Sequence, residues 1–272
     1  MQTFFDSKHL PMVLFALFRF RLSWACAIAV STAAQASAYP AAELAKLPTS
    51  FSRCLGFFAG QQPPPVPRAP RQRELCFDGF AVLHSGDSKT PVFVAQRLNS
   101  KALGGVKRHK SDRFFADARL PRMERAELED YKRSGYSRGH LAPSGDMATE
   151  EAMAQSFSLA NMVPQAIRHN SGAWAKIEQD TRKYVLRAAG DVYVITAPVF
   201  DSASLRIGPN GVRVPSHLFK LVYDSHTGQA WAHWQANSDD EHASRPISYQ
   251  ELVRRTRVEW LPRQAARPRG PG

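Results

Sequence analysis

The sequence predicts an α+β protein, in which short strands and a few helices follow one another without regular alternation. Short runs rich in valine and phenylalanine lie between turn-forming clusters, as in residues 77–84 and 91–98. One longer stretch, residues 170–188, carries apolar side chains at helical spacing. Hydrophobic residues make up 43% of the 272 positions, which is enough for a substantial core, and no internal repeat is visible.

Residues 1–38 have the features of a secretory signal peptide rather than of a folded segment. Arg19 and Arg21 precede the apolar run 24–30, and the small residues 36–38 match a signal-peptidase cleavage site. An uncleaved membrane anchor is the alternative, but the two arginines leave too short an apolar stretch to span a bilayer. We therefore expect an exported protein, periplasmic or secreted, with no membrane association in its mature form. Met12 is an alternative start.

Two cysteines, Cys54 and Cys76, remain after such a signal is removed. An even pair in an oxidising compartment predicts a disulfide, which would close the proline-rich loop 61–73. Two free buried thiols are the alternative. A zinc site is not indicated, because neither a CxxC nor a paired-histidine spacing accompanies the cysteines. Residues 39–75 are interpreted as a lead-in with this loop, residues 76–260 as the main domain and residues 261–272 as a loose basic tail.

The first half of the main domain is expected to be mostly extended. The sequence first predicts a hairpin of residues 77–84 and 91–98, a basic loop over 106–113 and a segment held against the core over 114–121. A short helix within 126–132 and a strand over 136–141 are expected next. A helix over 150–157 and an extended segment over 158–162 that ends at Pro164 complete this half.

A helix is predicted from Asn170 to the helix-ending Gly190. Its core-facing stripe consists of Trp174, Ile177, Thr181, Tyr184 and Ala188, at intervals of three or four residues. A second ridge with a spacing of four consists of Asn170, Trp174, Glu178 and Arg182, so its polar members border a common cleft.

The remainder is predicted to return to strands. We expect strands over 192–197, 217–223 and 229–236, a turn over 206–211, and a last helix to about residue 259. Ser248 followed by Glu251 forms the capping box for that helix.

The net charge of the chain indicates which class of binding partner it favours. Lysine and arginine outnumber aspartate and glutamate by 36 to 24, which gives a formal net charge of +12. A basic surface favours polyanions, because phosphate neutralisation releases counterions. The alternative is a basic soluble protein with no special partner.

Candidate catalytic residues lie close together in the sequence, between positions 138 and 182. They are a histidine, two asparagines, a glutamate and two arginines: His140, Asn161, Asn170, Glu178, Arg138 and Arg182. A histidine with a pKa near about 6.5 can accept a proton from water at neutral pH. Mg²⁺ keeps several of its waters, so one amide ligand can suffice, and arginine forks match phosphate oxygens. This set is typical of phosphodiester cleavage.

Each member of this set also has a simpler interpretation. A lone histidine after glycine is usually a packed or surface residue. Asn161 before Val-Pro can be a turn former, and Glu178 with Arg182 can be an exposed ion pair. Asp146 is assigned to structure, because no second carboxylate pairs with it to hold a metal.

The motifs Arg138-Gly139-His140, 161–165 and Asn170-x3-Trp174-x3-Glu178 resemble the DNA/RNA non-specific endonucleases. The resemblance runs from about residue 76 to 236. It implies a ββα-metal (His-Me finger) nuclease core, with an antiparallel sheet and flanking helices, within residues 76–260. It also implies Mg²⁺ as cofactor, with Mn²⁺ as a substitute, and DNA and RNA as substrates cleaved to 5′-phosphate products.

The resemblance also assigns roles to individual residues. His140 would be the general base, Asn170 the direct Mg²⁺ ligand, and Glu178 would hold a metal-bound water from the second shell. Asn161 would organise the metal and the histidine. The arginines that would contact phosphate or support the site are Arg113, Arg138 and Arg182.

One position departs from the family pattern, because Ser137 stands where the family usually has aspartate before Arg-Gly-His. None of the expected groups reads a base or a 2′-hydroxyl, which predicts cleavage of both DNA and RNA, weakened by salt. Two other functions compete: a catalytically impaired nucleic-acid-binding protein on the same scaffold, and a phosphoesterase for small esters. Monomer and homodimer are both compatible with the sequence.

Overall fold

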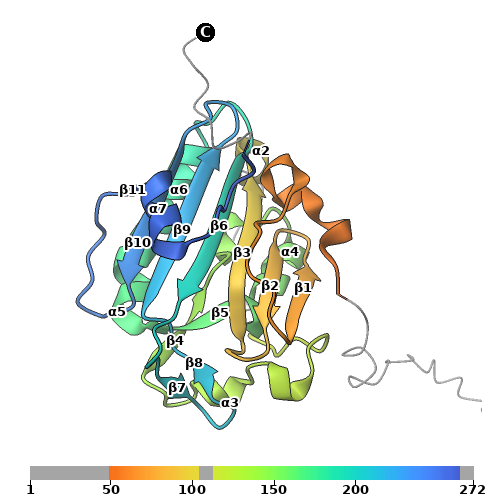
Figure 1. Cartoon of the computed structure of the whole chain (residues 1–272), viewed down its shortest axis with the longest axis vertical. Helices are drawn as coiled ribbons and strands as arrows, with labels where there is room; N and C mark the ends of the chain where they lie inside the picture. Colours follow the sequence, from red (N-terminus) through yellow and green to blue (C-terminus); the bar gives the residue numbers. More distant parts are fainter. Residues whose placement is uncertain (1–48, 104–112, 264–272) are drawn as a thin grey trace, which may run out of the picture. The chain divides into compact units, whose positions relative to one another are not determined.

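The computed structural model describes residues 49–103 and 113–263. Its described part is built on a seven-stranded antiparallel sheet with the strand order β1-β2-β3-β6-β9-β10-β11 (Figure 1). The strands are β1 (Gln72–Cys76), β2 (Ala81–Ser85), β3 (Thr90–Leu98), β6 (Val192–Val199), β9 (His217–Asp224), β10 (Ala230–Ala236) and β11 (Ile247–Ser248). An α+β fold is therefore confirmed.

Two small sheets and several short helices complete the described chain. The paired strands are β4 (Tyr136–His140) with β5 (Met162–Ala166), and β7 (Arg206–Ile207) with β8 (Val212–Arg213). The α-helices are α2 (Ser100–Leu103), α3 (Leu128–Tyr131), α4 (Glu150–Ser156), α5 (Ile167–His169), α6 (Ala175–Val185) and α7 (Tyr249–Thr256). The 3-10 turns are η1 (Phe51–Arg53), η2 (Leu55–Phe57), η3 (Ala59–Gln61), η4 (Arg122–Glu124), η5 (Ser144–Asp146) and η6 (Leu159–Asn161), and η7 (Asn170–Trp174) is a π-helical turn.

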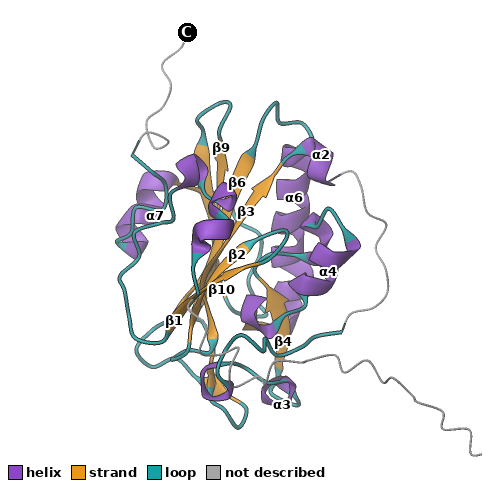
Figure 2. Cartoon of the chain, turned by 90° about the vertical axis from the view of Figure 1, so that its right-hand side faces the viewer, coloured by secondary structure: helices purple, strands orange, loops and turns teal. Residues whose placement is uncertain are grey.

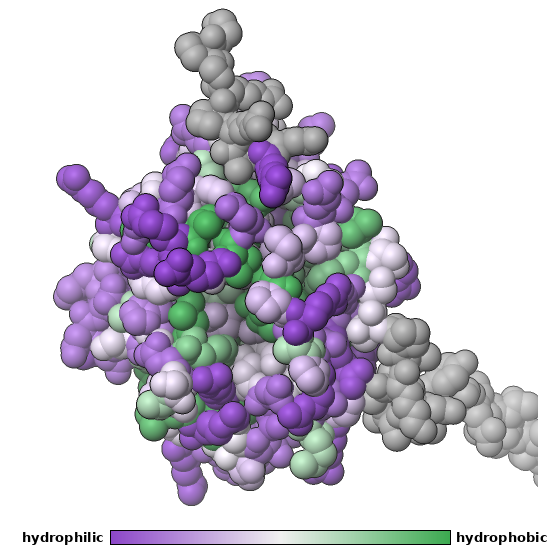
Figure 3. Space-filling view, viewed as in Figure 1, coloured by the Kyte–Doolittle hydropathy of each residue, from purple (hydrophilic) through white to green (hydrophobic). Residues whose placement is uncertain are grey.

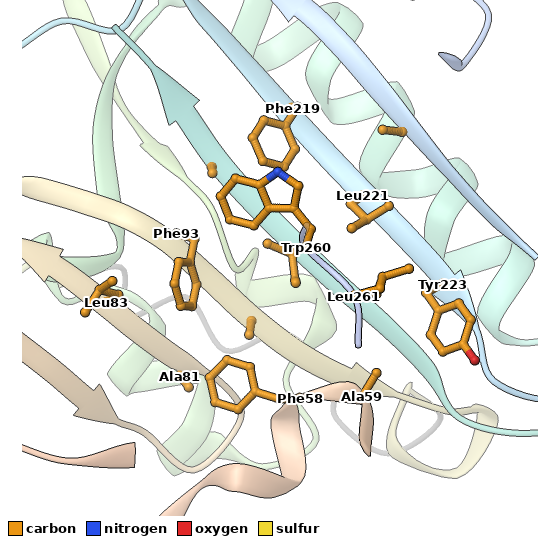
Figure 4. Packing of buried hydrophobic residues seen from close by; sticks show 14 of the residues in the cluster. Phe58, Ala59, Ala81, Leu83, Phe93, Phe219, Leu221, Tyr223, Trp260 and Leu261 are labelled. Atoms are coloured by element: carbon orange, nitrogen blue, oxygen red, sulfur yellow. The ribbon is translucent and has the colours of Figure 1, made fainter. Parts of the chain in front are cut away.

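The central strands are hydrophobic on both sides because both faces of the sheet are covered. Figure 2 shows α7 on one side of the sheet, and α4, α6 and the β4 hairpin on the other. On the α7 side, side chains from the sheet meet the N-terminal 3-10 turns and the segment after α7. Phe58, Phe93, Phe219 and Trp260 pack there in a buried cluster (Figure 4), with the Phe219 and Trp260 ring centroids 5.0 Å apart.

The opposite face carries the elements that hold the candidate site. Val94 and Leu218 of the sheet share a buried cluster with Leu141, Trp174 and Ile177, which come from the chain after β4 and from the helix that starts at Ile167. Because successive side chains of a strand point to opposite faces, β2, β3 and β9 each contribute to both clusters. The sheet therefore serves as the platform on which the β4–β5 hairpin and this helix pack.

The face that carries α7 is mainly hydrophilic, with apolar side chains gathered near its middle (Figure 3). Several hydrophobic residues next to the first cluster are only partly buried, among them Phe57, Val199 and Ile247.

No helix among residues 49–103 and 113–263 is long and apolar enough to cross a membrane.

Most predicted elements are present with small shifts of their ends. The β2–β3 hairpin, α3, β4, α4, β6, β9 and β10 all lie where the sequence predicts them. Helix α7 begins after Ser248, whose hydroxyl accepts a hydrogen bond from the Glu251 N–H, but it ends at Thr256, because Arg257 is left-handed with φ 57°. The predicted signal peptide, most of the basic loop and most of the tail lie outside the described residues.

Three expectations were wrong. The extended segment 158–162 is instead the 3-10 turn η6, which Ser158 caps by accepting from the Ala160 N–H. Pro164 lies within β5 rather than ending it, and this is tolerated because β5 pairs with β4 alone, so its other edge needs no N–H from residue 164. Strand β1 begins at Gln72, inside the region expected to be loop, and pairs with β2.

The predicted disulfide is confirmed. Cys54 and Cys76 are bonded, with their Cα atoms 5.7 Å apart and a sequence separation of 22 residues. The bond joins the turn after η1 to the end of β1, so it secures the N-terminal segment that covers the first cluster.

We predict that replacing both cysteines, Cys54→Ser with Cys76→Ser, lowers the free energy of unfolding by about 3 kcal/mol, because a closed loop of this length restricts the unfolded chain. Urea unfolding of both proteins under oxidising conditions measures the difference. The same comparison with reductant is the control, since the two proteins should then unfold at the same midpoint. Equal midpoints under oxidising conditions would contradict the prediction.

Candidate active site

The hairpin of β4 and β5 sets the position of His140. His140 is the last residue of β4 and pairs with Met162, while Arg138 pairs with Pro164. Residues two apart on a strand share a face, so Arg138 and His140 project together, about 6.7 Å apart along the strand. Gly139 faces the other way, where an added Cβ would lie 2.6 Å from Gln165 Cβ. The glycine between them is therefore required by the close approach of β5.

The imidazole of His140 is half-buried in an aromatic corner. Its centroid is 5.1 Å from the Phe157 ring, which it meets edge-on, and 5.8 Å from the Phe114 ring. The Arg138 guanidinium lies over the other part of this corner, 4.1 Å from the Phe114 centroid. These contacts restrict the orientation of the imidazole. Sequence reasoning did not single out either phenylalanine, since Phe114 was expected only to pack against the core.

Asn161 is fully buried and holds the chain that follows His140. Its Oδ1 accepts from the Ala142 N–H at 2.9 Å, and its Nδ2 donates to the Ala142 and Ser156 carbonyls, each at 2.9 Å. Its own carbonyl accepts from the Leu141 N–H at 3.0 Å. Because both amide hydrogens are engaged with backbone carbonyls, Asn161 acts as a positioning residue. These bonds fix the backbone of the two residues that follow His140.

The helix that carries Asn170 differs from the predicted one. It starts at Ile167, three residues earlier, and Asn170–Trp174 form a π-helical turn before α6. The wider turn brings His169 and Trp174, five residues apart, to the buried side, with ring centroids 5.7 Å apart and neither side chain exposed. Asn170 stays half-exposed. A π turn of this kind is frequent at functional sites.

The buried His169 is neutral at physiological pH. Burial lowers its pKa to about 4, and the Gln165 amide nitrogen donates to its Nδ1 at 3.1 Å. Gln165, which also fills the space beside Gly139, thereby joins β5 to the start of the helix.

A distant loop caps this helix. The Asp239 carboxylate accepts from the Arg168 N–H at 2.7 Å. Asn237 accepts from the Ala166 N–H at 2.8 Å, and its Nδ2 donates to the Pro164 and Pro215 carbonyls. The first N–H groups of a helix need such partners, and none of the adjacent side chains supplies one. Asn237 and Asp239 therefore position the helix, although sequence reasoning did not identify them.

Strand β4 and the helix meet directly beneath His140. Leu141 and Ala142, which follow His140, share the second buried cluster with Trp174 and Ile177, which follow Asn170. Asn170 precedes Trp174 by about one turn and is half-exposed, so it does not point into the hydrophobic interior. The structure thus packs the residues that follow His140 and those that follow Asn170 into one buried cluster.

The donor atoms near this junction fit a hydrated hard cation. No group of three or more His, Cys, Asp or Glu side chains that could hold a metal occurs among the described residues. Asn170 and Glu178 both offer oxygen, but eight residues of helix separate them by about 12 Å. A cation held by Asn170 would therefore reach Glu178 through water, as expected for Mg²⁺, which keeps much of its hydration shell.

Four charged residues beneath the site form a buried network, which we call the charge network: Asp146, Glu178, Arg182 and Lys220. Arg182 pairs with Asp146 at 3.0 Å, which joins α6 to the turn η5 after His140. Lys220 is 1% exposed in the central strand β9, where its Nζ donates to Thr196 Oγ1 at 2.8 Å and lies 5.5 Å from the Trp174 ring centroid. Gln96 of β3 donates to Asp146 at 3.4 Å.

Burial dominates the protonation of this network. It raises the pKa of Glu178 to about 7, while the positive charges of Lys220 and Arg182 oppose this shift and Asp146 reinforces it. Burial also raises the pKa of Asp146, although the positive charges of Lys220 and Arg182 act to lower it. Burial lowers the pKa of Lys220, although the negative charges of Glu178 and Asp146 act to raise it. Glu178 is thus close to half-protonated near neutral pH, and a cation bound nearby would favour its charged form.

The three predicted arginines occupy different places. Arg138 lies beside His140 and stacks on Phe114. Arg182 is 28% exposed and supports the turn after His140 through Asp146. Arg113 is exposed and adjoins Phe114 in sequence, which places its backbone near the aromatic corner. Ser137 donates from its hydroxyl to the Gln165 carbonyl at 2.9 Å, so it adds a side-chain hydrogen bond between β4 and β5 at the position where the family usually has aspartate.

A histidine at the end of a hairpin strand, followed by a helix with an asparagine in its first turns, defines the ββα class of nuclease sites. The profile of the DNA/RNA non-specific endonucleases matches residues 64–259, and the chain belongs to this family. Its members are nucleases.

Relatives and a solved structure agree with this assignment. The chain is 37% identical over 145 residues to "Nuclease EXOG, mitochondrial" of Danio rerio, covering 49% of this chain and 42% of the relative. It is 32% identical over 162 residues to "Endonuclease G, mitochondrial" of Bos taurus, covering 55% of this chain and 54% of the relative. A chain in the crystal structure of the EndoG/EndoGI complex has the same fold, with a TM-score of 0.62 and 23% identity over 71% of this chain and 86% of that one. The matches thus span about half the length of these curated relatives.

We predict that Glu178 makes a contribution to the free energy of unfolding of the metal-free protein that falls as pH rises from about 4.5 to about 7, while the buried His169, whose pKa is lowered, contributes in the opposite direction. The folded-state pKa of Glu178, about 7, lies above its ordinary value of 4.5, so the native protein holds a proton that the unfolded chain releases in this range. Glu178→Gln should remove this contribution. Urea unfolding at successive pH values in chelator measures it.

The matched control is Glu151→Gln, which changes an exposed glutamate of α4. It should keep the wild-type pH dependence. A Glu178→Gln protein whose stability has the same pH dependence as that of the wild type would contradict the assignment of the raised pKa to Glu178.

Proposed function

We propose that this chain is an exported, Mg²⁺-dependent endonuclease that hydrolyses phosphodiesters in both DNA and RNA. The observation that carries the proposal is the junction of β4 with the Asn170 helix, where His140 sits in its aromatic corner above the second cluster. Membership of the endonuclease family supports the same activity.

His140 would act as the general base. Its ring is half-buried, and Phe114 and Phe157 restrict its orientation, so it can take a proton from a water aligned with the phosphorus atom. Arg138 projects from the same face of β4 and would bind a non-bridging phosphate oxygen. Asn161 and the charge network keep the chain after His140 fixed during the reaction.

Mg²⁺ held by the Asn170 amide oxygen would stabilise the negative charge that develops on the phosphate. Glu178, eight residues further along the same helix, would hold a water of that ion's hydration shell. Mn²⁺ also prefers oxygen ligands in octahedral geometry and would substitute.

Non-specificity toward sugar and sequence follows from the kind of groups offered. Arg138 and Arg182 would bind phosphate, and the formal net charge of +12 attracts it. DNA and RNA share this group. Cleavage of both polymers should weaken steeply with salt, since phosphate contacts release counterions.

Export is proposed from the N-terminal sequence and from the disulfide. Residues 1–38 have the signal-peptide pattern, and Cys54–Cys76 is the kind of bond that persists in oxidising compartments such as the periplasm or the medium.

The test is supercoiled plasmid and a folded RNA incubated with the pure protein, with Mg²⁺ and with chelator. We expect nicking and then degradation of the plasmid and degradation of the RNA with Mg²⁺, and neither with chelator. A protein that shifts the plasmid on a gel without cutting it would be a binding protein instead. Turnover of a small chromogenic diester without plasmid nicking would indicate a small-ester phosphoesterase.

We predict that His140→Ala lowers the rate of plasmid cleavage by about 100-fold or more, as removal of a general base does. Circular dichroism and the unfolding midpoint should stay close to wild type. His226→Ala, which removes an exposed histidine from the turn between β9 and β10, is the control and should retain full activity. Retained cleavage in pure His140→Ala protein would refute the mechanism.

A further inference from the structure

A cavity of about 510 Å³ opens directly beside the candidate active site. This volume falls within the roughly 300–1,000 Å³ typical of small-molecule sites. Its lining combines three aromatic rings with charged groups, from α3, the start of β4 and the segment before α3: Phe114, Tyr131, Tyr136, Glu129, Lys132 and Arg138. We call it the aromatic cavity. The catalytic roles proposed above use only Arg138 and Phe114 from this set.

Phe114 is the wall between the aromatic cavity and His140. Its ring is 5.8 Å from the imidazole centroid and 4.1 Å from the Arg138 guanidinium carbon, and both Phe114 and Arg138 line the cavity. Along β4, Arg138 and His140 are two residues apart, which corresponds to about 6.7 Å. A group bound in the cavity would therefore lie close to a phosphate held between Arg138 and His140.

The Tyr131 hydroxyl is a buried donor with no hydrogen-bond partner among the described residues. Tyr131 is only 6% exposed, and burial together with the neighbouring Asp130 raises the pKa of its hydroxyl above the ordinary value, so the group keeps its proton. At the rim, Lys132 and Glu129 form an exposed ion pair at 3.4 Å.

We infer that the aromatic cavity is a subsite for one nucleobase of the substrate strand, next to the scissile phosphate. The inference rests on the proposed nuclease function and extends it to a second contact with the substrate. The aromatic rings provide faces for base stacking, which every base accepts, so the site adds affinity without imposing a sequence. The exposed Glu129 carboxylate at the rim can accept hydrogen bonds from base edges.

The subsite is tested with inhibitors of plasmid nicking that differ only by the base. Thymidine 5′-monophosphate and 2′-deoxyadenosine 5′-monophosphate should inhibit wild-type protein about 5- to 100-fold more tightly than deoxyribose 5-phosphate, as expected for one stacked base. The variant Leu128→Trp places an indole at the cavity wall, where Leu128 is 44% exposed, and should bring the three inhibition constants together. Tyr136→Ala, which removes a ring, should have the same effect.

The control is Leu186→Trp, the same substitution at a leucine that is 52% exposed at the end of α6, away from the cavity lining. It should retain the wild-type advantage of nucleotide over sugar phosphate. Inhibition by deoxyribose 5-phosphate itself should be unchanged in Leu128→Trp, which shows that the phosphate site is intact.

The outcomes separate the two proposals. If wild-type protein does not nick plasmid with Mg²⁺, the proposed function fails, and the subsite fails with it. If it nicks plasmid but nucleotides inhibit no better than the sugar phosphate, or if Leu128→Trp and Tyr136→Ala keep the full advantage, the aromatic cavity is not a base subsite and the nuclease assignment stands.

Discussion

The candidate site depends on the burial of one lysine. Lys220 lies in the middle of the central sheet, and its charge is sustained there by Thr196, by the Trp174 ring and by the carboxylates of Asp146 and Glu178. A buried charge is tolerated only when such partners are close. Asp146 lies in the turn after His140, and Glu178 lies on the helix that carries Asn170. The interaction of Lys220 with these two residues therefore holds both the turn and the helix against the sheet. The arginine at 182 closes the arrangement by pairing with Asp146.

Local signals were sufficient for most of the fold and for the identity of the central residues. Alternating apolar runs located the β2–β3 hairpin, β6, β9 and β10, because each strand buries side chains on a platform with period two. The even pair of cysteines that remains after the expected signal peptide predicted the disulfide correctly. The order of the Arg-Gly-His, Asn-Met-Val-Pro-Gln and helical motifs indicated the family, and the residues that follow His140 and Asn170 share one buried cluster. Their catalytic and metal-binding roles stay predictions.

The features that sequence reasoning missed depend on partners far away in the chain. Asn237 and Asp239 cap a helix that begins about 70 residues earlier, and a capping search along the helix itself cannot find them. Phe114 was expected only to pack against the core and Phe157 only to end a helix, since aromatic spacing does not reveal which ring lies against an imidazole. The expected strand end at Pro164 was wrong because β5 has a neighbour on one side only, where a proline is tolerated. The number of neighbouring strands cannot be seen in a linear sequence.

The π turn at Asn170–Trp174 makes the register of this helix unusually sensitive to chain length. An α-helix rotates by about 100° per residue, so deleting one residue from the turn would let the segment relax to ordinary α geometry and swing the asparagine about a quarter-turn away from the hairpin. Trp174 and everything after it would remain seated on the sheet. The length of the chain between Ile167 and Trp174 therefore fixes the direction in which Asn170 points.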